Sequence, residues 1–231
     1  MPVAVVTGGS RGFGRALAVA LAKDGWSLVI DGRDRGMLQE VADRLKAMGS
    51  QSVAVAGDVA DAGHRCALIE SAAELGSLDL LINNASTLGP SPLPKIANYP
   101  LDELRQVYEV NVIAPLALLQ AAIPHLRRAR GTAVCLSSDA ATEAYEGWGG
   151  YGSSKAALDQ LHGVLAAEEP LLRVYQFDPG DMRTAMHQAA FPGEDISDRP
   201  VPEAAVGPLR GLLDSGAPSG RYRADQWTGQ P

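Results

Sequence analysis

The sequence predicts an α/β fold in which a doubly wound parallel sheet lies between two layers of helices. Short apolar runs alternate along the chain with longer segments that carry apolar residues at helical spacing. This alternation is typical of a parallel sheet with both faces covered. The chain has 231 residues, 46% of them hydrophobic, and a chain of this length can bury one substantial core. We therefore expect residues 1–231 to form a single domain.

Each short apolar run is expected to be one strand, and each longer pattern one helix. Strands are expected at Val3–Val6, Ser27–Asp31, Ser52–Ala56, Asp79–Ile82, Thr132–Leu136 and Leu172–Phe177, with a last short one at Arg221–Ala224. Helices are expected at Arg15–Lys23, Gly36–Met48, Ala60–Leu75, Leu101–Arg128 and Tyr151–Glu168. A Pro-, Gly- and Asp-containing loop near Phe191–Pro202 precedes a short final helix.

The charge balance limits the partners that the protein can bind. The formal net charge is −7, and an acidic protein is not attracted to nucleic acid or to an anionic membrane, so any anion site must be local. Cys66 and Cys135 are the only cysteines, without CxxC spacing or a cluster of histidines. We expect no disulfide framework and no metal site, and we expect both cysteines to be small buried hydrophobic residues.

The N-terminal residues and the apolar runs indicate the cellular compartment that we expect. Met1 and Pro2 lead directly into the first strand, with no basic segment of the kind that marks a secretory signal. No apolar run in the sequence approaches the length of a membrane span. We therefore expect the protein in the reducing cytoplasm.

A glycine-rich turn follows the first strand. Thr7–Gly14 reads TGGSRGFG and joins that strand to the first helix. Glycines let the backbone adopt positive φ and approach a pyrophosphate closely, while the free N–H groups and the dipole at a helix start favour its negative charge. The order strand, glycine loop, helix therefore predicts a phosphate site. The competing interpretation is a tight turn without a ligand.

The end of the second strand carries side chains of opposite charge. In a dinucleotide-binding fold this strand end faces the adenosine ribose, where a carboxylate would bind the 2′-hydroxyl and an arginine would suit a 2′-phosphate. Asp31 and Arg33 therefore predict different ligands. Alternation along a strand points both to the same face, and the arginine has the longer reach. Arg11 in the glycine loop could contact the same phosphate from the other side.

Tyr151 and Lys155 are expected on one face of a helix, because residues four apart on a helix are neighbours. A cation beside a phenol favours the phenolate and lowers the tyrosine pKa from about 10, so Tyr151 could exchange a proton near neutral pH. Ser138 lies thirteen residues upstream, at the end of the fifth strand. The alternative interpretation is a tyrosine packed on a lysine stem.

Polar or glycine-containing segments directly follow several strands. They are Gly8–Gly14, Asp58, Asn83, Ser138 and Pro179–Gly180. Ligands on a parallel sheet bind beyond the carboxyl ends of the strands, so these segments are expected to line one site. Asn111 is a further candidate, because asparagine is unfavourable in the middle of the helix where it lies. No catalytic triad is suggested by the histidines, which are His64, His125, His162 and His187.

Together these residues resemble the short-chain dehydrogenase/reductase family over about Val3–Thr184. The resemblance is carried by TGGSRGFG, Asp58, NNA at Asn83–Ala85, Asn111, Ser138, YGSSK at Tyr151–Lys155 and DPGDMRT at Asp178–Thr184. It implies a Rossmann-type sheet, a nicotinamide cofactor and a catalytic set of Asn111, Ser138, Tyr151 and Lys155. It implies cofactor contacts from Gly8, Ser10, Arg11, Gly12, Phe13, Gly14, Arg33, Asp58, Val59, Asn84, Ala85, Tyr151, Lys155, Pro179, Gly180, Met182 and Thr184.

The resemblance also implies a role for each catalytic side chain. Ser138 would hydrogen-bond the substrate oxygen, and Tyr151 would pass a proton to or from it during hydride transfer. Lys155 would lower the Tyr151 pKa and hold the nicotinamide ribose, and Asn111 would hold a water that links Lys155 to solvent. NAD-dependent members carry an acidic residue at the position of Gly32. Arg33 and Arg11 therefore favour NADPH.

Two features depart from the family pattern. Ser86 stands where the family usually has glycine, and the tail after Thr184 is short and lacks the usual glycine-rich ending. The substrate loop is expected at about 181–202. A cationic or polyol substrate would fit the acidic residues near the expected pocket, although solvated loop charges are the simpler interpretation. These residues are Glu143, Glu146, Glu194, Asp195 and Asp198.

The expected function is that of an NADP(H)-dependent oxidoreductase interconverting an alcohol and a ketone or aldehyde, with NAD(H) as the less favoured cofactor. The alternative is a regulatory protein of the same fold that binds the dinucleotide as a sensor, without catalysis. A nucleotide-sugar epimerase or dehydratase needs a larger C-terminal domain than the residues after Thr184 provide. A homodimer or homotetramer is expected, through the apolar helices around 112–126 and 156–165.

Overall fold

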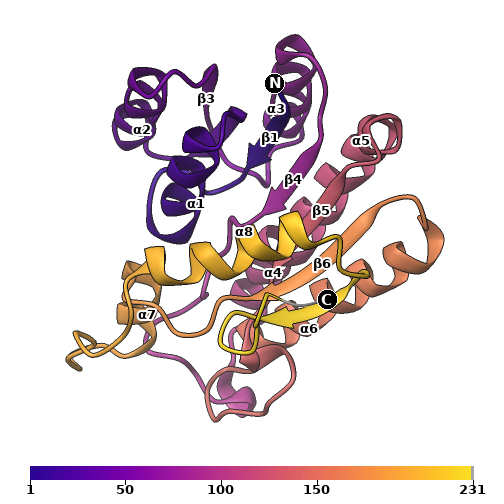
Figure 1. The fold of residues 1–231 in the computed structure, drawn as a ribbon. Coiled ribbons are helices and arrows are strands. Elements are labelled where there is room, and N and C mark those ends of the chain that lie inside the picture. Colours follow the sequence, from indigo (N-terminus) through magenta and orange to yellow (C-terminus); the bar gives the residue numbers. More distant parts are fainter. Residues whose placement is uncertain (230–231) are drawn as a thin grey trace.

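Seven parallel strands form one sheet. The structure is a computed structural model that describes residues 1–229, and its strands lie in the order β3-β2-β1-β4-β5-β6-β7 (Figure 1). The strands are β1 (Val3–Val6), β2 (Ser27–Gly32), β3 (Ser52–Ala56), β4 (Leu80–Asn83), β5 (Thr132–Leu136), β6 (Arg173–Asp178) and β7 (Gly220–Arg223). The order reverses between β1 and β4, which is the point where such sheets bind ligands at their carboxyl ends. The predicted doubly wound, Rossmann-type fold is confirmed.

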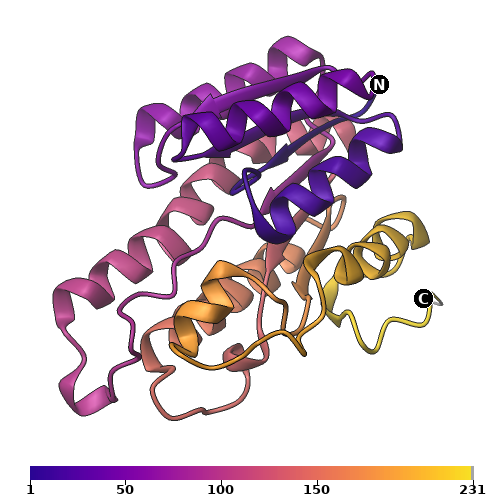
Figure 2. The ribbon, with the colours of Figure 1, turned by 90° about the vertical axis from the view of Figure 1, so that its left-hand side faces the viewer.

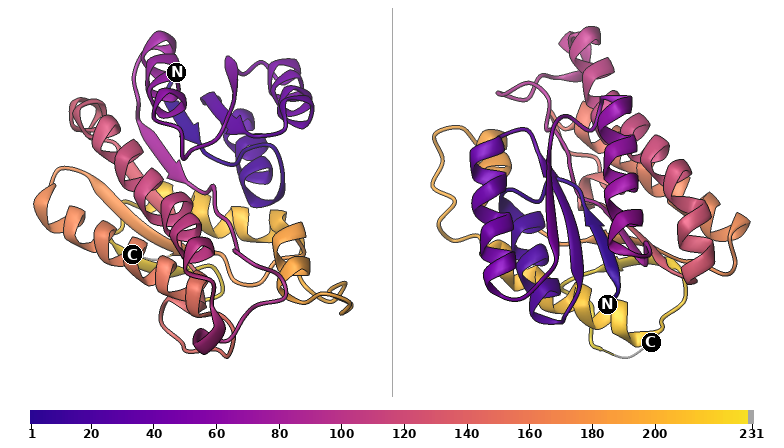
Figure 3. Two further views of the ribbon diagram at one scale, coloured as in Figure 1. Left: turned by 180° about the vertical axis from the view of Figure 1, so that it is seen from behind. Right: turned by 90° about the horizontal axis from the view of Figure 1, so that it is seen from above.

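Helices cover both faces of the sheet (Figure 3). One face carries α1 (Gly12–Lys23), α2 (Arg35–Ala47) and α8 (Val206–Ser215), and the other carries α3 (Ala62–Leu75), α5 (Ala114–Ala129) and α6 (Gly149–Glu168). Successive side chains of a strand point to opposite faces, so strands covered on both sides are apolar throughout. In β1, Val6 belongs to the first core cluster and Val5 to the second.

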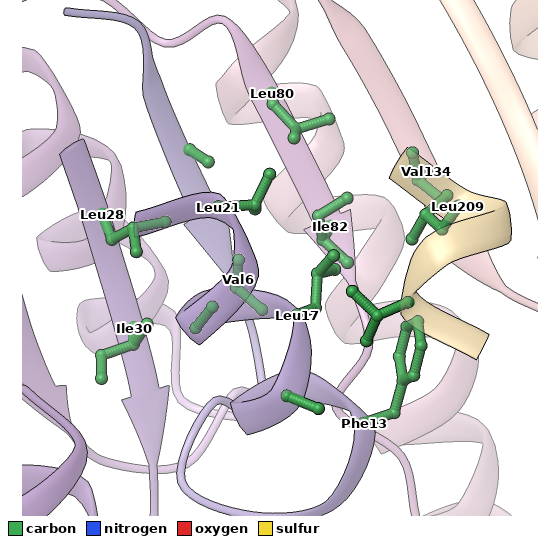
Figure 4. Close-up of a cluster of buried hydrophobic side chains, with 14 of the residues drawn as sticks. Val6, Phe13, Leu17, Leu21, Leu28, Ile30, Leu80, Ile82, Val134 and Leu209 are labelled. Carbon is green, nitrogen blue, oxygen red and sulfur yellow. The ribbon is translucent and has the colours of Figure 1, made fainter. Parts of the chain in front are cut away.

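The cluster beneath α1 fixes the start of that helix. Leu17 and Leu21 of α1 lie against Val6 and Ile30 from the strands, and Leu209 of α8 closes the group (Figure 4). All of these side chains are at most 2% exposed. The packing holds the N-terminus of α1 at the carboxyl end of β1, where the glycine loop lies.

A π-helical turn divides the segment that the sequence predicts as one helix over 101–128. α4 (Leu101–Tyr108) leads into the π turn (Glu109–Ile113), and α5 follows. Pro115 lies in the first turn of α5, directly after the π turn. Asn111 lies inside the π turn. Turns of this type are rare and frequently occur at functional sites.

By length and composition alone, the continuous helical segment Leu101–Ala129 could cross a membrane. This differs from the expectation that no run approaches that length. In the structure, Leu118, Ala122 and Leu126 of α5 pack in the same core cluster as Val5 of β1. The segment therefore has the surroundings of a core helix.

Other departures from the sequence prediction are local. α1 begins at Gly12 instead of Arg15, and α7 (Ala185–Ala190) lies where the sequence predicts no helix. Figure 2 shows α7 in orange, below the indigo N-terminal helix. Short 3-10 helices lie at Ile96–Asn98, Asp139–Ala141 and Pro202–Ala205. Cys135 is buried as predicted, but the prediction for Cys66 is wrong, because it lies on the solvent side of α3.

Candidate active site

Side chains at the strand ends hold the glycine loop in place. Thr7 Oγ1 donates to the carbonyl of Ile82 at 3.2 Å and accepts from the N–H groups of Asn84 and Ala85, both at 3.0 Å. Asn84 Nδ2 donates to the carbonyl of Thr7 at 2.6 Å and to that of Gly8 at 3.3 Å. The loop is therefore tied to the end of β4, at the reversal of strand order.

Gly14 shows why this turn needs glycine. A Cβ atom there would lie 2.4 Å from the carbonyl oxygen of Gly8 and 2.5 Å from Nδ2 of Asn84. The residue before α1, Arg11, places no side-chain acceptor on the helix start. The N–H groups of the first turn therefore remain available to an anion.

Asp31 and Arg33, the two side chains that predict different ligands at the end of β2, lie in different surroundings. Asp31 is buried, and its Oδ1 accepts the N–H of Gly8 at 2.6 Å. Arg33 is exposed, as is Arg11 in the glycine loop. A Cβ on Gly32 would lie 2.8 Å from Oγ of Ser10, so this position has little room for the acidic side chain of an NAD-dependent relative.

Three residues expected at the cofactor differ in exposure. Asp58 is exposed, and its Oδ1 accepts the N–H of Ala60 at 2.9 Å. Val59 is 9% exposed. Phe13 is 4% exposed and stacks on Phe177 in the core, so only its backbone can face a bound anion.

Ser138, Tyr151 and Lys155 meet at the end of β5. Lys155 is 2% exposed, and its Nζ donates to the carbonyl of Leu136 at 2.7 Å while lying 5.5 Å from the centroid of the Tyr151 ring. Ser138 Oγ donates to Oδ1 of Asp139 at 3.0 Å. A substrate oxygen would therefore compete with Asp139 for the serine proton.

The environment shifts the Tyr151 pKa in the direction opposite to the prediction. Burial raises it most, the Asp178 carboxylate raises it further, and the Ser138 hydroxyl lowers it. Burial also lowers the pKa of Lys155 to about 8. In this structure Tyr151 therefore holds its proton firmly, as a proton donor does.

Asn111 is fully engaged by protein groups. Its Oδ1 accepts from Ser86 Oγ at 3.1 Å and from the N–H of Thr87 at 2.8 Å, while Nδ2 donates to the carbonyl of Thr87 at 2.8 Å and to Ser154 Oγ at 3.0 Å. These bonds use both amide protons and both oxygen lone pairs. The water proposed for Asn111 could therefore contact only its backbone. Ser86, which departs from the family pattern, supports Asn111.

The segment after β6 returns over the glycine loop. Gly180 adopts a φ of +71°, and its N–H donates to Oδ1 of Asp178 at 3.0 Å. Thr184 caps α7 by accepting the N–H of His187 at 3.1 Å. A Cβ on Gly12 would lie 3.7 Å from Cγ2 of Thr184. Thr184 thus lies beside the start of α1.

Aromatic side chains stand next to Tyr151. The Trp148 ring lies edge-on to the Tyr151 ring, with centroids 5.7 Å apart, and 6.1 Å from the Phe191 ring. The His187 ring lies 4.9 Å from that of Phe191. This aromatic group joins the loop before α6 to the segment predicted as the substrate loop.

A cavity of about 640 Å³ lies beyond Ala140 and Gly152, and Ser138 and Tyr151 do not line it. Glu143 and Glu146 line this cavity, and Glu146 forms an ion pair with Lys95 at 2.7 Å. The other acidic residues predicted near the pocket are exposed in the loop after α7: Glu194, Asp195 and Asp198. The acidic residues therefore divide between two places.

Sequence reasoning missed Asp159 and Arg221. Arg221 Nε donates to Oδ2 of Asp159 at 3.2 Å, close behind Ser138. Neither residue belongs to a sequence motif, since Arg221 lies in a short terminal strand and Asp159 lies on an apolar helix. Only the sheet topology places β7 beside β6 and brings them to the site.

Comparisons with known proteins agree with this geometry. The model of the short chain dehydrogenase family matches residues 2–195. Sepiapterin reductase of Mus musculus is 35% identical over 201 residues, covering 81% of this chain and 77% of its own. An alcohol dehydrogenase of Thermococcus sibiricus complexed with 5-hydroxy-NADP has a TM-score of 0.87 at 27% identity, over 96% of this chain and 95% of its own. A 7α-hydroxysteroid dehydrogenase complexed with NADH and a 7-oxo bile acid has a TM-score of 0.83 at 27% identity, over 95% and 91%.

A seven-stranded parallel sheet with a glycine loop, and with a serine, a tyrosine and a lysine at one strand end, defines a dinucleotide-fold oxidoreductase. The chain belongs to the short-chain dehydrogenase family.

Proposed function

We propose that the protein interconverts a small carbonyl compound and its alcohol with NADP(H), using Tyr151 as acid and base. The observation that carries this proposal is the meeting of Ser138, Tyr151 and Lys155 at the end of β5. Relatives bound to an NADP derivative or to NADH support a dinucleotide, and the exposed Arg33 and Arg11 favour the phosphorylated form.

The residues fit such a cofactor. The open start of α1 offers N–H groups to its pyrophosphate, and Arg33 and Arg11 would hold a 2′-phosphate. Lys155 would hold the nicotinamide ribose, and Gly180 and Thr184 would hold the carboxamide end. When bound, the cofactor supplies hydride chemistry at the substrate carbon.

The side chains around the substrate oxygen would have different roles in hydrogen bonding and proton transfer. Ser138 Oγ would turn from Asp139 to hydrogen-bond the oxygen, and Tyr151 would donate its proton to it during reduction. The raised pKa of Tyr151 keeps that proton in place until the oxygen develops charge. The backbone of Asn111 would support the return of a proton from solvent through Lys155.

The test is a panel of ketones, aldehydes and alcohols with NADPH and NADH, assayed with the wild type and with Tyr151→Phe. Tyr151→Phe should lower kcat by about 100-fold or more, because it removes the transferable proton, and leave the NADPH Kd nearly unchanged. Substantial kcat in Tyr151→Phe would assign the proton transfer to another group. Cofactor binding by a wild type that turns over no panel member would favour the sensor alternative.

We also propose that copies of the chain associate through α5 and α6. Val164 on α6 is 43% exposed, and Ile113, which adjoins α5, is 47% exposed. Apolar side chains on these helices would be covered by a second copy. The reducing cytoplasm remains the proposed compartment.

A further inference from the structure

Arg221 of β7 joins three elements behind the proposed catalytic side chains. Its Nη2 donates to the backbone carbonyl of Ser138 at 2.9 Å and to Oδ2 of Asp178 at 3.1 Å, and its Nε donates to Oδ2 of Asp159 at 3.2 Å. The Asp178 side chain is 2% exposed, and that of Asp159 is 14% exposed. One guanidinium therefore spans the ends of β5 and β6 and the inner face of α6.

Each carboxylate that Arg221 binds also holds another part of the site. Asp178 Oδ1 accepts the N–H of Gly180, in the turn that leads to the substrate loop. Asp159 Oδ2 accepts the hydroxyl proton of Ser137 at 2.6 Å. Asp159 also lies one helical turn beyond Lys155 on α6. A change at Arg221 would therefore reach both Ser138 and the turn after β6.

We propose that Arg221 is a positioning residue for the reaction, which fixes the Ser138 carbonyl and offsets the negative charges of Asp159 and Asp178 behind Tyr151. This inference rests on the proposed function of Tyr151 as acid and base. Arg221 acts through these neighbours, since it touches Ser138 only at the backbone.

The charged groups near Tyr151 show why this offset matters. They come from α6, β6, β7 and the 3-10 helix after β5, and are Lys155, Asp159, Asp178, Arg221 and Asp139. The imidazole of His187 on α7 lies farther along the aromatic group, beyond Trp148 and Phe191. The three carboxylates raise the Tyr151 pKa, and Arg221 is hydrogen-bonded to two of them. Loss of the guanidinium would leave these two carboxylates without their cation and raise that pKa further.

The test compares Arg221→Ala and Arg221→Lys with Arg223→Ala as the matched control. Arg223 lies on the same strand, and its charge also acts on Asp178 and Asp139, but its side chain hydrogen-bonds Asp225 at 3.2 Å. Carbonyl reduction needs protonated Tyr151, so kcat falls as pH rises through the Tyr151 pKa. In Arg221→Ala this falling limb should move up by at least about half a pH unit, with kcat at least about tenfold lower and the NADPH Kd within about twofold of wild type. Arg221→Lys and Arg223→Ala should both show smaller changes than Arg221→Ala, because Arg223 acts on Asp178 and Asp139 through its charge and hydrogen-bonds Asp225.

A second measurement needs no turnover. Burial already raises the pKa of Asp159, and Arg221 lowers it again. In Arg221→Ala that pKa should rise further, so the folded state loses more stability as pH rises through it. The loss of Tm relative to wild type should therefore be greater at about pH 7.5 than at about pH 5. A wild type that turns over no carbonyl would overturn the proposed function, and the Tm comparison would still test the charge offset.

The outcomes that contradict the inference are equally specific. An unmoved pH limb, together with a Tm loss that is the same at both pH values, would mean that Arg221 only packs. If Arg221→Ala does not fold, the pH profiles of Arg221→Lys and Asp159→Asn test the inference instead. Asp159→Asn removes one negative charge and should move the falling limb to lower pH. A limb that moves up or stays in place in that variant would overturn the inference.

Discussion

The Asp31 carboxylate is hydrogen-bonded to the imidazole of His64 beneath the glycine loop. Asp31 Oδ2 lies 2.9 Å from Nε2 of His64, and the two side chains are only 2% and 6% exposed. A carboxylate oxygen only accepts, so Nε2 is the donor. Because the other carboxylate oxygen accepts the N–H of Gly8, Asp31 connects α3 to the loop. This carboxylate is therefore engaged by protein groups, whereas an NAD-type interaction would require it at the ribose.

Replacing Asp31 should weaken both cofactors equally. Asp31→Ala removes the acceptor of the Gly8 N–H, and a charge-assisted bond of this kind contributes about 1.5 to 3 kcal/mol. We expect the Kd values of NADPH and NADH to rise together by about tenfold, measured by titration of the nicotinamide fluorescence. Asp34→Ala, which removes only the exposed N-cap of α2, is the control and should leave both unchanged. A loss confined to one cofactor would show that Asp31 contacts the ribose after all.

Arg33 should set the cofactor preference instead. Its exposed guanidinium at the tip of β2 could bind a 2′-phosphate, which NADH lacks. Arg33→Ala should reduce the preference for NADPH over NADH by about tenfold or more, determined as the ratio of kcat/KM values. Arg35→Ala, two residues on in α2, is the control. Equal efficiencies in the wild type, or an unchanged ratio in Arg33→Ala, would contradict the interpretation of this strand end.

The sequence predicts this fold well because the signals are local. Alternation of apolar strands with helical patterns identifies all seven strands to within one residue at each end, and each motif at a strand end lies where a parallel sheet places ligands. The sequence points to Asn111 because asparagine disfavours a regular helix. The structure gives the physical reason, since Asn111 lies in a π turn with all four of its hydrogen-bonding positions used.

What the sequence could not supply depends on contacts between distant segments. The pairing of Asp31 with His64 crosses 33 positions, and that of Asp159 with Arg221 crosses 62. Neither pair forms a motif. The prediction that Lys155 lowers the Tyr151 pKa considered one neighbour, while burial and Asp178 act in the other direction.

His162 should make the stability of the fold depend on pH. Burial lowers its pKa to about 4, and its Nδ1 lies 3.0 Å from the carbonyl of Leu158. Between about pH 6.5 and about pH 4 the unfolded chain binds a proton that the folded chain excludes, so stability falls as pH falls through this window. His162→Leu should remove this loss of the free energy of unfolding, which amounts to up to about 3 kcal/mol across that range. Denaturant unfolding at several pH values measures it. His125→Leu, on α5, should keep the wild-type slope, and an unchanged slope in His162→Leu would contradict the prediction.

Association of the chain should depend on α6. Light scattering at micromolar concentration should give the mass of a dimer or tetramer, and Val164→Asp should lower that mass, because it places a charge on an exposed apolar position of the proposed interface. Met37→Asp is the matched control, since Met37 is 39% exposed but lies on α2 in the opposite layer. A monomeric wild type, or equal masses for the wild type and Val164→Asp, would place the interface elsewhere or remove it.

The π turn between α4 and α5 also fixes the helical phase of the segment. One extra residue per turn rotates everything beyond it by about 100° relative to an uninterrupted α-helix. With that rotation, Asn111 contacts Thr87 and Ser154 while Leu118 and Leu126 face the sheet. A one-residue deletion within the turn could preserve a regular helix, but it would swing either Asn111 or the apolar stripe of α5 out of position. This stretch should therefore accept changes of residue type at its exposed positions and reject any change of length.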